Sequence, residues 1–127
     1  MPERVMNIGI MDREQYRQRT IAIARGEYIP RDDEPKVWFE SLQSVAQILS
    51  NDNQRLLKLI MELQPQSLRE LEQLSGRSAS NLSRTLKTMA RYGFVEIERD
   101  KQRIIPRVVA SEFKVEFGLA PQHQGNQ

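Results

Sequence analysis

The sequence of 127 residues contains no cysteine and a single histidine, His123. The lack of cysteine excludes disulfides, thiol catalysis and the cysteine-based zinc sites. One histidine, in the polar tail that ends the sequence, is too few for a Ser–His–Asp hydrolase or a histidine-rich metal site. Only scattered carboxylates are left as catalytic candidates, so we expect a binding protein that has no cofactor and is not an enzyme.

Long apolar runs are also missing, because no segment approaches the roughly 18 apolar residues that span a membrane. The first four residues, Met1 to Arg4, do not resemble the start of a signal peptide. Hydrophobic residues make up 39% of the chain and charged residues 28%, and the length suits one ordinary domain. These features predict a cytoplasmic protein that does not contact membranes.

The small net charge of +2 hides an uneven distribution. Between residues 77 and 107, eight basic and three acidic residues give a net charge of +5, which leaves −3 for the rest of the chain. Such polarity favours a protein that presents one face to a polyanion. The alternative is an ordinary solvated surface.

The clearest helical patterns lie between residues 51 and 92. Asn51 or Asp52 is expected to cap a first helix, which Pro65 ends. Ser67 and Glu70 form a capping box at the start of a second, short helix. Ser78 caps a third helix that ends at Gly93. The apolar residues expected to face inward from these helices are Leu56, Leu57, Leu59, Ile60, Leu63, Leu68, Leu71, Leu74, Ala79, Leu82, Leu86, Met89 and Ala90.

A β-hairpin is predicted directly after the third helix. Residues 94–99 alternate apolar and charged side chains, residues 100–102 make the turn, and residues 103–109 return. Pro106 restricts the return strand to a sheet edge or ends its pairing. Three helices followed by a hairpin is the order of a winged helix-turn-helix, predicted here over residues 51–110 with residues 94–108 as the wing.

The first 50 residues are predicted to form an N-terminal α/β extension. We expect strands at 5–11 and 36–39, a helix from Asp12 to Gly26 with Gln15 completing its capping box, a loop at 28–35, and a helix at 42–49 capped by Ser41. Residues 111–120 hold a closing strand, and residues 121–127 are expected to be a disordered tail. The expected fold class is thus mainly α with a small β component.

The outward face of the third helix, residues 78–92, carries the side chains suited to a major groove. Its early part holds three residues that can read base edges: Ser80, Asn81 and Arg84. The residues expected to contact phosphates are Arg77, Ser78, Lys87, Thr88, Arg91, Arg99, Lys101 and Arg103. Taken one by one, the small polar residues are explained equally well as helix caps and the cations as solvated side chains.

Residues 67–108 resemble the winged-helix regulators of the MarR/ArsR type. The segment LSGRSASNLSRTL, residues 74–86, is similar to their recognition helix, and YGFVE, residues 92–96, to their entry into the wing. The whole chain resembles a small group of DNA-binding proteins often paired with a toxin as its antitoxin. The resemblance implies a dimeric transcription regulator, yet the long flanking dimerisation helices of MarR proteins and the metal-sensing cysteines and histidines of ArsR proteins are missing.

Four large aromatic residues in the extension, Tyr16, Tyr28, Trp38 and Phe39, are candidates for a dimer or partner interface. They are equally well explained as core. In the partner version, the acidic loop residues Asp32, Asp33 and Glu34 face a basic patch on a toxin.

The sequence leaves three functions open. The first is a sequence-specific repressor that binds double-stranded DNA as a homodimer. The second is an antitoxin that neutralises a cognate toxin through its N-terminal region and autoregulates its operon. The third is a winged helix used only for protein contacts.

Overall fold

The computed structural model describes residues 4–119. The expected tail at 121–127 therefore lies outside the described residues. Backbone contacts divide the chain into two compact units, one containing residues 46–112 and the other residues 6–45 together with the segment from residue 113. The sequence predicts a division between residues 50 and 51 and a separate closing strand at 111–120. No helix of the described residues is long and apolar enough to cross a membrane.

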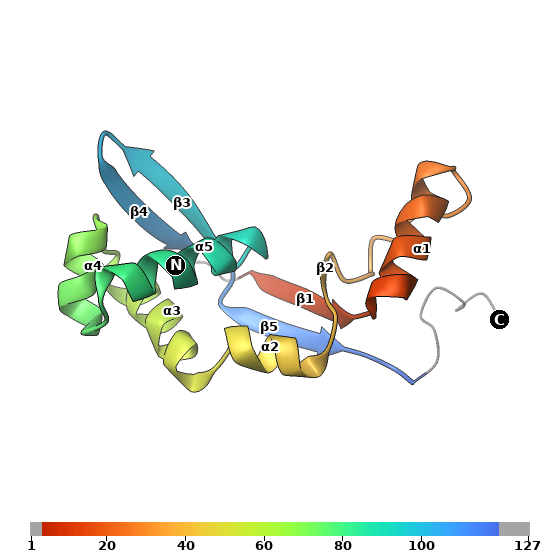
Figure 1. The fold of residues 1–127 in the computed structure, drawn as a ribbon, viewed down its shortest axis with the longest axis horizontal. Coiled ribbons are helices and arrows are strands. Elements are labelled where there is room, and N and C mark those ends of the chain that lie inside the picture. Colours follow the sequence, from red (N-terminus) through yellow and green to blue (C-terminus); the bar gives the residue numbers. More distant parts are fainter. Residues whose placement is uncertain (1–3, 120–127) are drawn as a thin grey trace. The chain divides into compact units, whose positions relative to one another are not determined.

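The first unit contains three helices and a hairpin (Figure 1). Helix α3 spans Asn51–Leu63, α4 spans Leu68–Ser75 and α5 spans Ala79–Arg91. Strands β3 (Val95–Asp100) and β4 (Arg103–Val108) pair antiparallel, from Val95 opposite Val108 to Asp100 opposite Arg103. This order of elements is a winged helix-turn-helix, as the sequence predicted.

Local signals in the sequence set the ends of these helices. Ser78 caps α5 by accepting the Asn81 N–H at 3.2 Å, and Gly76 ends α4 with a φ of 74°. Our prediction was wrong for α3, whose cap is Ser50, because the Ser50 Oγ accepts the Asn53 N–H at 3.2 Å.

The capping box predicted for Ser67 and Glu70 at the start of α4 also departs from the expected form. The Ser67 Oγ accepts the Glu70 N–H, but the Glu70 carboxylate accepts the N–H of Gln66 at 2.8 Å, one residue before the cap. Helix α4 thereby has its first turn tied to the chain that enters it.

The core of the first unit is formed by the inward side chains of all three helices and the base of the hairpin. Leu71, Leu82, Met89 and Phe94 are fully buried. Leu63 and Leu74, expected to face inward, are 55% and 41% exposed because they lie at the helix ends, beyond the last packed turn. The β4 pairing continues past Pro106, so this proline does not end the strand.

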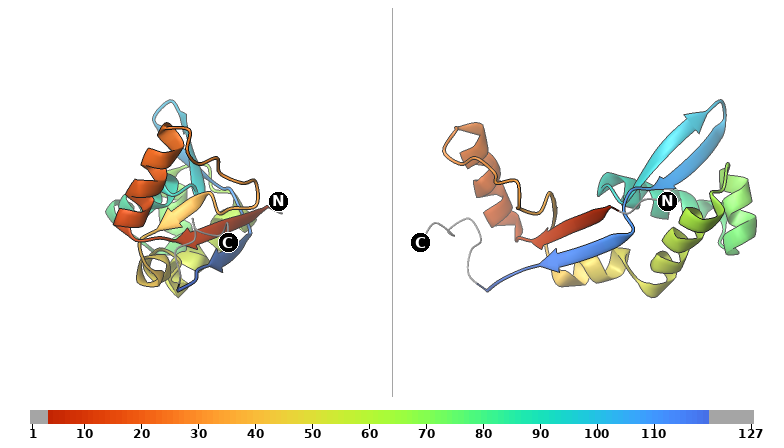
Figure 2. Two further views of the ribbon diagram at one scale, coloured as in Figure 1. Left: turned by 90° about the vertical axis from the view of Figure 1, so that its right-hand side faces the viewer. Right: turned by 180° about the vertical axis from the view of Figure 1, so that it is seen from behind.

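The second unit is built on a three-stranded sheet in the order β2-β1-β5. Strand β1 (Val5–Ile10) pairs in parallel with β2 (Val37–Phe39), with Gly9 opposite Trp38, and helix α1 (Arg13–Ala24) makes the crossover. Strand β5 (Glu112–Glu116) runs alongside β1 in the same direction (Figures 1 and 2).

The predicted elements of this region are confirmed. Asp12 and Gln15 form the capping box of α1. Helix α2 (Leu42–Ile48) begins after Ser41, which accepts the Ser44 N–H at 3.1 Å. Ile8 and Phe39 are the most buried apolar side chains of this unit, at 0% and 3% exposure.

Candidate nucleic-acid interface

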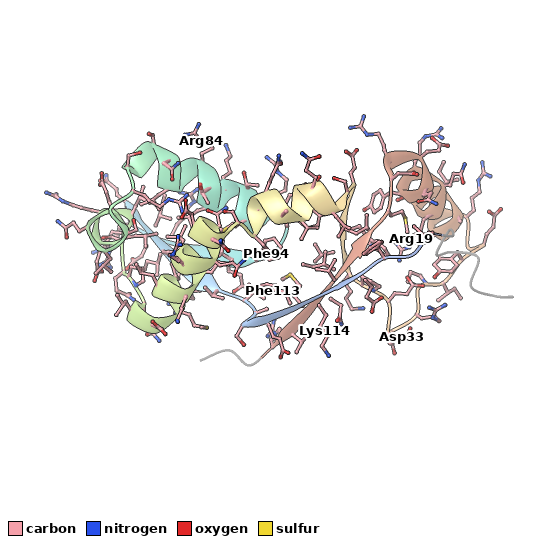
Figure 3. All side chains as sticks on the ribbon, turned by 90° about the horizontal axis from the view of Figure 1, so that it is seen from below. Arg19, Asp33, Arg84, Phe94, Phe113 and Lys114 are labelled. Atoms are coloured by element: carbon pink, nitrogen blue, oxygen red, sulfur yellow. The ribbon has the colours of Figure 1, made fainter. Side chains whose placement is uncertain are left out.

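The exposed face of α5 is the strongest candidate site in the winged-helix unit. Ser80, Arg84, Lys87 and Arg91 are exposed, at spacings of three and four residues that place them in one stripe. Helix α5 contains no acidic residue. Figure 3 shows Arg84 pointing away from the helix into solvent. Within residues 4–119, these cations form no ion pair or hydrogen bond through their side chains, so they are available to an anionic ligand.

A groove between α5 and the hairpin brings two of the predicted phosphate contacts together. Its volume is about 300 Å³, and Ser83 and Lys87 of α5 line it together with Arg99 of β3. The rest of its lining is apolar: Leu68, Leu86, Ala90, Ile97 and Ile104. The groove therefore combines two cations with a mainly apolar lining.

Sequence reasoning missed Ser83 as a lining residue of this groove. Its signal was present, because residue 83 lies one helical turn from both Ser80 and Lys87. We had considered only the side of the helix directly opposite the core. The position of the hairpin, which no local pattern specifies, decides that Ser83 faces a groove.

The two faces of the hairpin differ in charge. Opposite residues of an antiparallel pair share a face, so Ile97, Arg99 and Ile104 point one way. The other face holds the ion pairs Arg107–Glu98, at 2.7 Å, and Arg103–Asp100, at 2.6 Å. Arg103, which we expected to contact phosphate, is therefore neutralised locally. Arg99 and Lys101 are exposed and have no such partner in the described part of the chain.

Arg77 holds the helix-turn-helix together and does not extend into solvent. Its guanidinium donates to the Asn81 Oδ1 at 2.7 Å, to the Asn53 Oδ1 at 3.1 Å and to the Thr85 Oγ1 at 3.0 Å. These bonds join the starts of α3 and α5. The predicted role of Arg77 as a phosphate contact is not supported by this geometry, because three of its five N–H donors already have partners inside the unit.

Asn81 and Thr88 are also less available than predicted. A bidentate contact with adenine needs both the carbonyl oxygen and the amide hydrogens of asparagine, and the Asn81 oxygen accepts from Arg77. The Thr88 hydroxyl donates to the carbonyl of Arg84 at 3.1 Å, so its hydrogen is not free for a phosphate. Ser78 uses its oxygen in the helix cap and is exposed.

In the second unit, two of the four predicted interface residues, Tyr28 and Trp38, lie against the nearly buried side chain of Arg19. Arg19 and Glu34 form an ion pair at 2.8 Å, with side chains only 12% and 9% exposed. The Arg19 guanidinium lies 5.1 Å from the Trp38 ring centroid and 5.8 Å from that of Tyr28. A cavity of about 140 Å³ adjoins this cluster. These contacts fix the loop of residues 25–36 onto α1 and β2.

This arrangement corrects two expectations about the extension. Phe39 is 3% exposed and belongs to the core, and Glu34 is buried, so neither lies on a surface for a partner. Asp32, Asp33 and Tyr16 are exposed. Among the described residues, no cluster of three metal-ligating side chains occurs.

Comparison with known proteins identifies the family of the chain. The family model described as HVO_A0114 matches residues 48–115, more than half of the chain, and the protein therefore belongs to the HVO_A0114 family. No curated protein matches the sequence. A crystal structure of a predicted DNA-binding transcriptional regulator from E. coli is 20% identical, with a TM-score of 0.45 over 72% of this chain and 81% of that one. The resemblance to MarR/ArsR regulators and antitoxins stays a prediction.

Proposed function

We propose that the protein is a sequence-specific regulator of transcription that binds double-stranded DNA, with α5 in the major groove and the β3–β4 hairpin as the wing. One observation carries this proposal. The exposed stripe of α5 holds no carboxylate and three cations without an ion-pair partner among residues 4–119, and one of them, Lys87, shares a groove with Arg99 of the wing. Such a surface favours an anionic duplex over a protein partner.

The side chains of the stripe divide into two roles. Arg84 and Ser80 lie in the first half of α5, the part of a recognition helix that reaches base edges, and arginine pairs with guanine through two hydrogen bonds. Lys87, Arg91, Arg99 and Lys101 contact phosphates, which adds affinity without sequence information. Arg77 and Asn81 position α5 against α3.

A repressor that autoregulates its own operon binds a two-fold operator as a homodimer. Two recognition helices then enter successive major grooves about 34 Å apart on one face of the duplex. Selection of bound fragments from the source genome reveals both the site and its symmetry.

Arg84→Ala tests the proposal on the selected site. We expect binding to weaken by about 1–3 kcal/mol, because the variant loses a bidentate contact with guanine. The loss on non-specific duplex is smaller. Fluorescence anisotropy titration measures both. Arg13→Ala removes the same charge from an 87% exposed side chain of the other unit and serves as the matched control. Equal affinity of Arg84→Ala and the wild type for the selected site contradicts the assignment.

Fewer residues support the antitoxin alternative in the structure than in the sequence. Of the acidic loop, Asp32 and Asp33 are exposed, whereas Glu34 is committed to Arg19. Co-purification with the product of a neighbouring gene tests this alternative, and Asp32→Asn/Asp33→Asn should then abolish the complex.

A further inference from the structure

Strand β5 forms one end of the sheet in the second unit. In the order β2-β1-β5, its far edge has no strand beside it within the described residues. An open edge is a template for pairing with another chain, and proteins usually protect it with proline, charged side chains, a bulge or a covering segment. The segment 112–119 contains no proline, and it exposes Val115 at 41%, Phe117 at 54% and Leu119 completely.

The alternation of β5 separates apolar from charged side chains. Phe113 and Val115 fall on one face, where Phe117 continues the alternation directly after the strand, and Glu112, Lys114 and Glu116 fall on the other. Figure 3 shows Phe113 and Lys114 leaving the strand on opposite sides. One face of the strand is thus apolar and the other carries both signs of charge.

The hydrogen bonds of the sheet determine which backbone groups face the open edge. The Ser111 N–H donates to the Arg4 carbonyl at 3.1 Å, toward the chain of β1. In a parallel pair every second residue directs both its N–H and its C=O to the same neighbour. Glu112, Lys114 and Glu116 therefore direct their backbone groups to the open edge.

Only certain registers allow β5 to pair with its own copy around a two-fold axis. In an antiparallel pair, a residue whose backbone groups face the open edge must lie opposite a residue of the second copy whose backbone groups also face it. These residues alternate along β5, so the two-fold axis passes through a residue position and not between two residues. An axis at Lys114 sets lysine against lysine and Glu112 against Glu116, and an axis at Glu116 sets glutamate against glutamate. Like charges in opposition destabilise a sheet. An axis at Phe113 requires Ala110, which is 1% exposed, to join the pairing.

A two-fold axis at Val115 places opposite charges against each other and apolar side chains against each other in every pair. Lys114 then opposes Glu116 of the second copy, and Glu116 opposes Lys114 of the second copy. Phe113 meets Phe117 of the second copy on the apolar face, with the two Val115 side chains between these aromatic pairs. We propose that a second copy of this chain docks on β5 in this antiparallel register, which joins the two sheets into one of six strands.

This inference rests on the homodimer of the proposed function and names its interface. It differs from the interface expected from the aromatic residues of the extension, of which Tyr16 is exposed. Phe39 is buried, and Tyr28 and Trp38 are engaged with Arg19. The contact is isologous, which means that both copies use the same edge of β5. The assembly is therefore a closed dimer, and no β5 edge is left to bind a third chain.

A cysteine scan of the full chain tests the register directly, since the protein has no cysteine of its own. Single variants place cysteine at Phe113, Lys114, Val115 or Glu116. With the axis at Val115, two residues 115 face each other in a pair without mutual hydrogen bonds, about 4.5 Å apart at Cα. That separation suits a disulfide, so Val115→Cys should form a cross-linked dimer at least about ten times faster than the others under mild oxidant. Fastest cross-linking at another position, or equally slow cross-linking at all four, overturns the proposal.

A charge exchange tests the same register without a covalent bond. Lys114→Glu places glutamate opposite Glu116 of the second copy, and we expect the dimer dissociation constant in analytical ultracentrifugation to rise about ten-fold or more. Lys114→Glu/Glu116→Lys restores opposite charges and should return dimerisation to the wild-type level. Circular dichroism at low concentration checks that each variant is folded. A wild-type monomer, or a double variant as weak as the single one, overturns the proposal.

Both experiments use protein without DNA, so their outcomes are separate from the test of function. A dimer that is cross-linked through Val115→Cys but binds no duplex contradicts the proposed function and leaves the β5 interface in place. A monomer that binds the selected site contradicts the β5 interface and supports the proposed function.

Discussion

The two units of the chain differ in the kinds of side chain that they bury. In the winged-helix unit, large apolar side chains such as Leu71, Leu82, Met89 and Phe94 are fully buried, and the exposed cations of α5 lie outside the core. In the other unit, few apolar side chains are buried, an arginine and a glutamate are nearly buried, and several large apolar side chains are exposed. Helix α1 buries none of its residues. The first unit is held together by a large apolar core, whereas the second is held by polar contacts around Arg19 and by the pairing of its three strands.

The largest expected effect concerns the winged-helix core. Leu71→Ala, at a fully buried position, should destabilise that unit by about 2–5 kcal/mol, because it removes buried methyl groups and leaves a cavity. Leu63→Ala makes the same change at a 55% exposed position and should cost less than about 0.5 kcal/mol.

Urea unfolding measures both variants with two probes. Circular dichroism follows the whole chain, and the fluorescence of the single tryptophan, Trp38, follows the other unit. If the units are independent, Leu71→Ala shifts the first signal and leaves the Trp38 transition unchanged. An equal shift of both signals contradicts the contrast between the units.

A somewhat smaller effect is expected at the buried ion pair. Glu34→Gln keeps the shape of the side chain but leaves Arg19 without its counter-charge, which should destabilise the second unit by about 3 kcal/mol. The matched substitution Glu40→Gln breaks the exposed pair with Arg13 and should cost less than about 1 kcal/mol. The Trp38 fluorescence transition reports both. If the two variants lose equal stability, the pair is not the organising contact of this unit.

The smallest effect is expected at the wing and concerns the salt dependence of DNA binding. Arg99→Ala/Lys101→Ala removes two unpaired cations and should flatten the slope of log K against log salt by roughly one to two units. The control, Arg103→Ala/Arg107→Ala, removes cations that already have carboxylate partners and should change the slope less. If the slope changes more in the control than in Arg99→Ala/Lys101→Ala, the face with Arg103 and Arg107, and not the one with Arg99, contacts the DNA.

Local sequence signals predicted most of the elements but not all of their ends. The capping residues Asp12, Ser41, Ser67 and Ser78 marked helix starts correctly, because a cap depends only on the residues beside it. The cap of α3 was misplaced by one or two residues, since Ser50, Asn51 and Asp52 are all good caps and their spacing alone does not separate them.

The candidate site was predicted in part, and its errors share one cause. The helical wheel placed Arg84, Lys87 and Arg91 outward, where the structure has them. It placed Asn81 with them, yet Asn81 turns toward Arg77, which also contacts Asn53, 24 residues earlier in the chain. A wheel describes one helix and contains nothing about its neighbours.

The sequence by itself determined the order of elements, the inward stripe of α5 and the cations that flank it, because these follow from residue spacing and from local caps. Only the tertiary structure decided which charges are available. Arg19 and Arg77 are engaged with Glu34 and Asn53, 15 and 24 residues away in the sequence, whereas the side chains of Arg84 and Lys87 have no such partner among the described residues. The physical reason is that an ion pair or a shared hydrogen bond depends on distance in space, and side chains far apart in the sequence come within hydrogen-bonding distance only when the chain has folded.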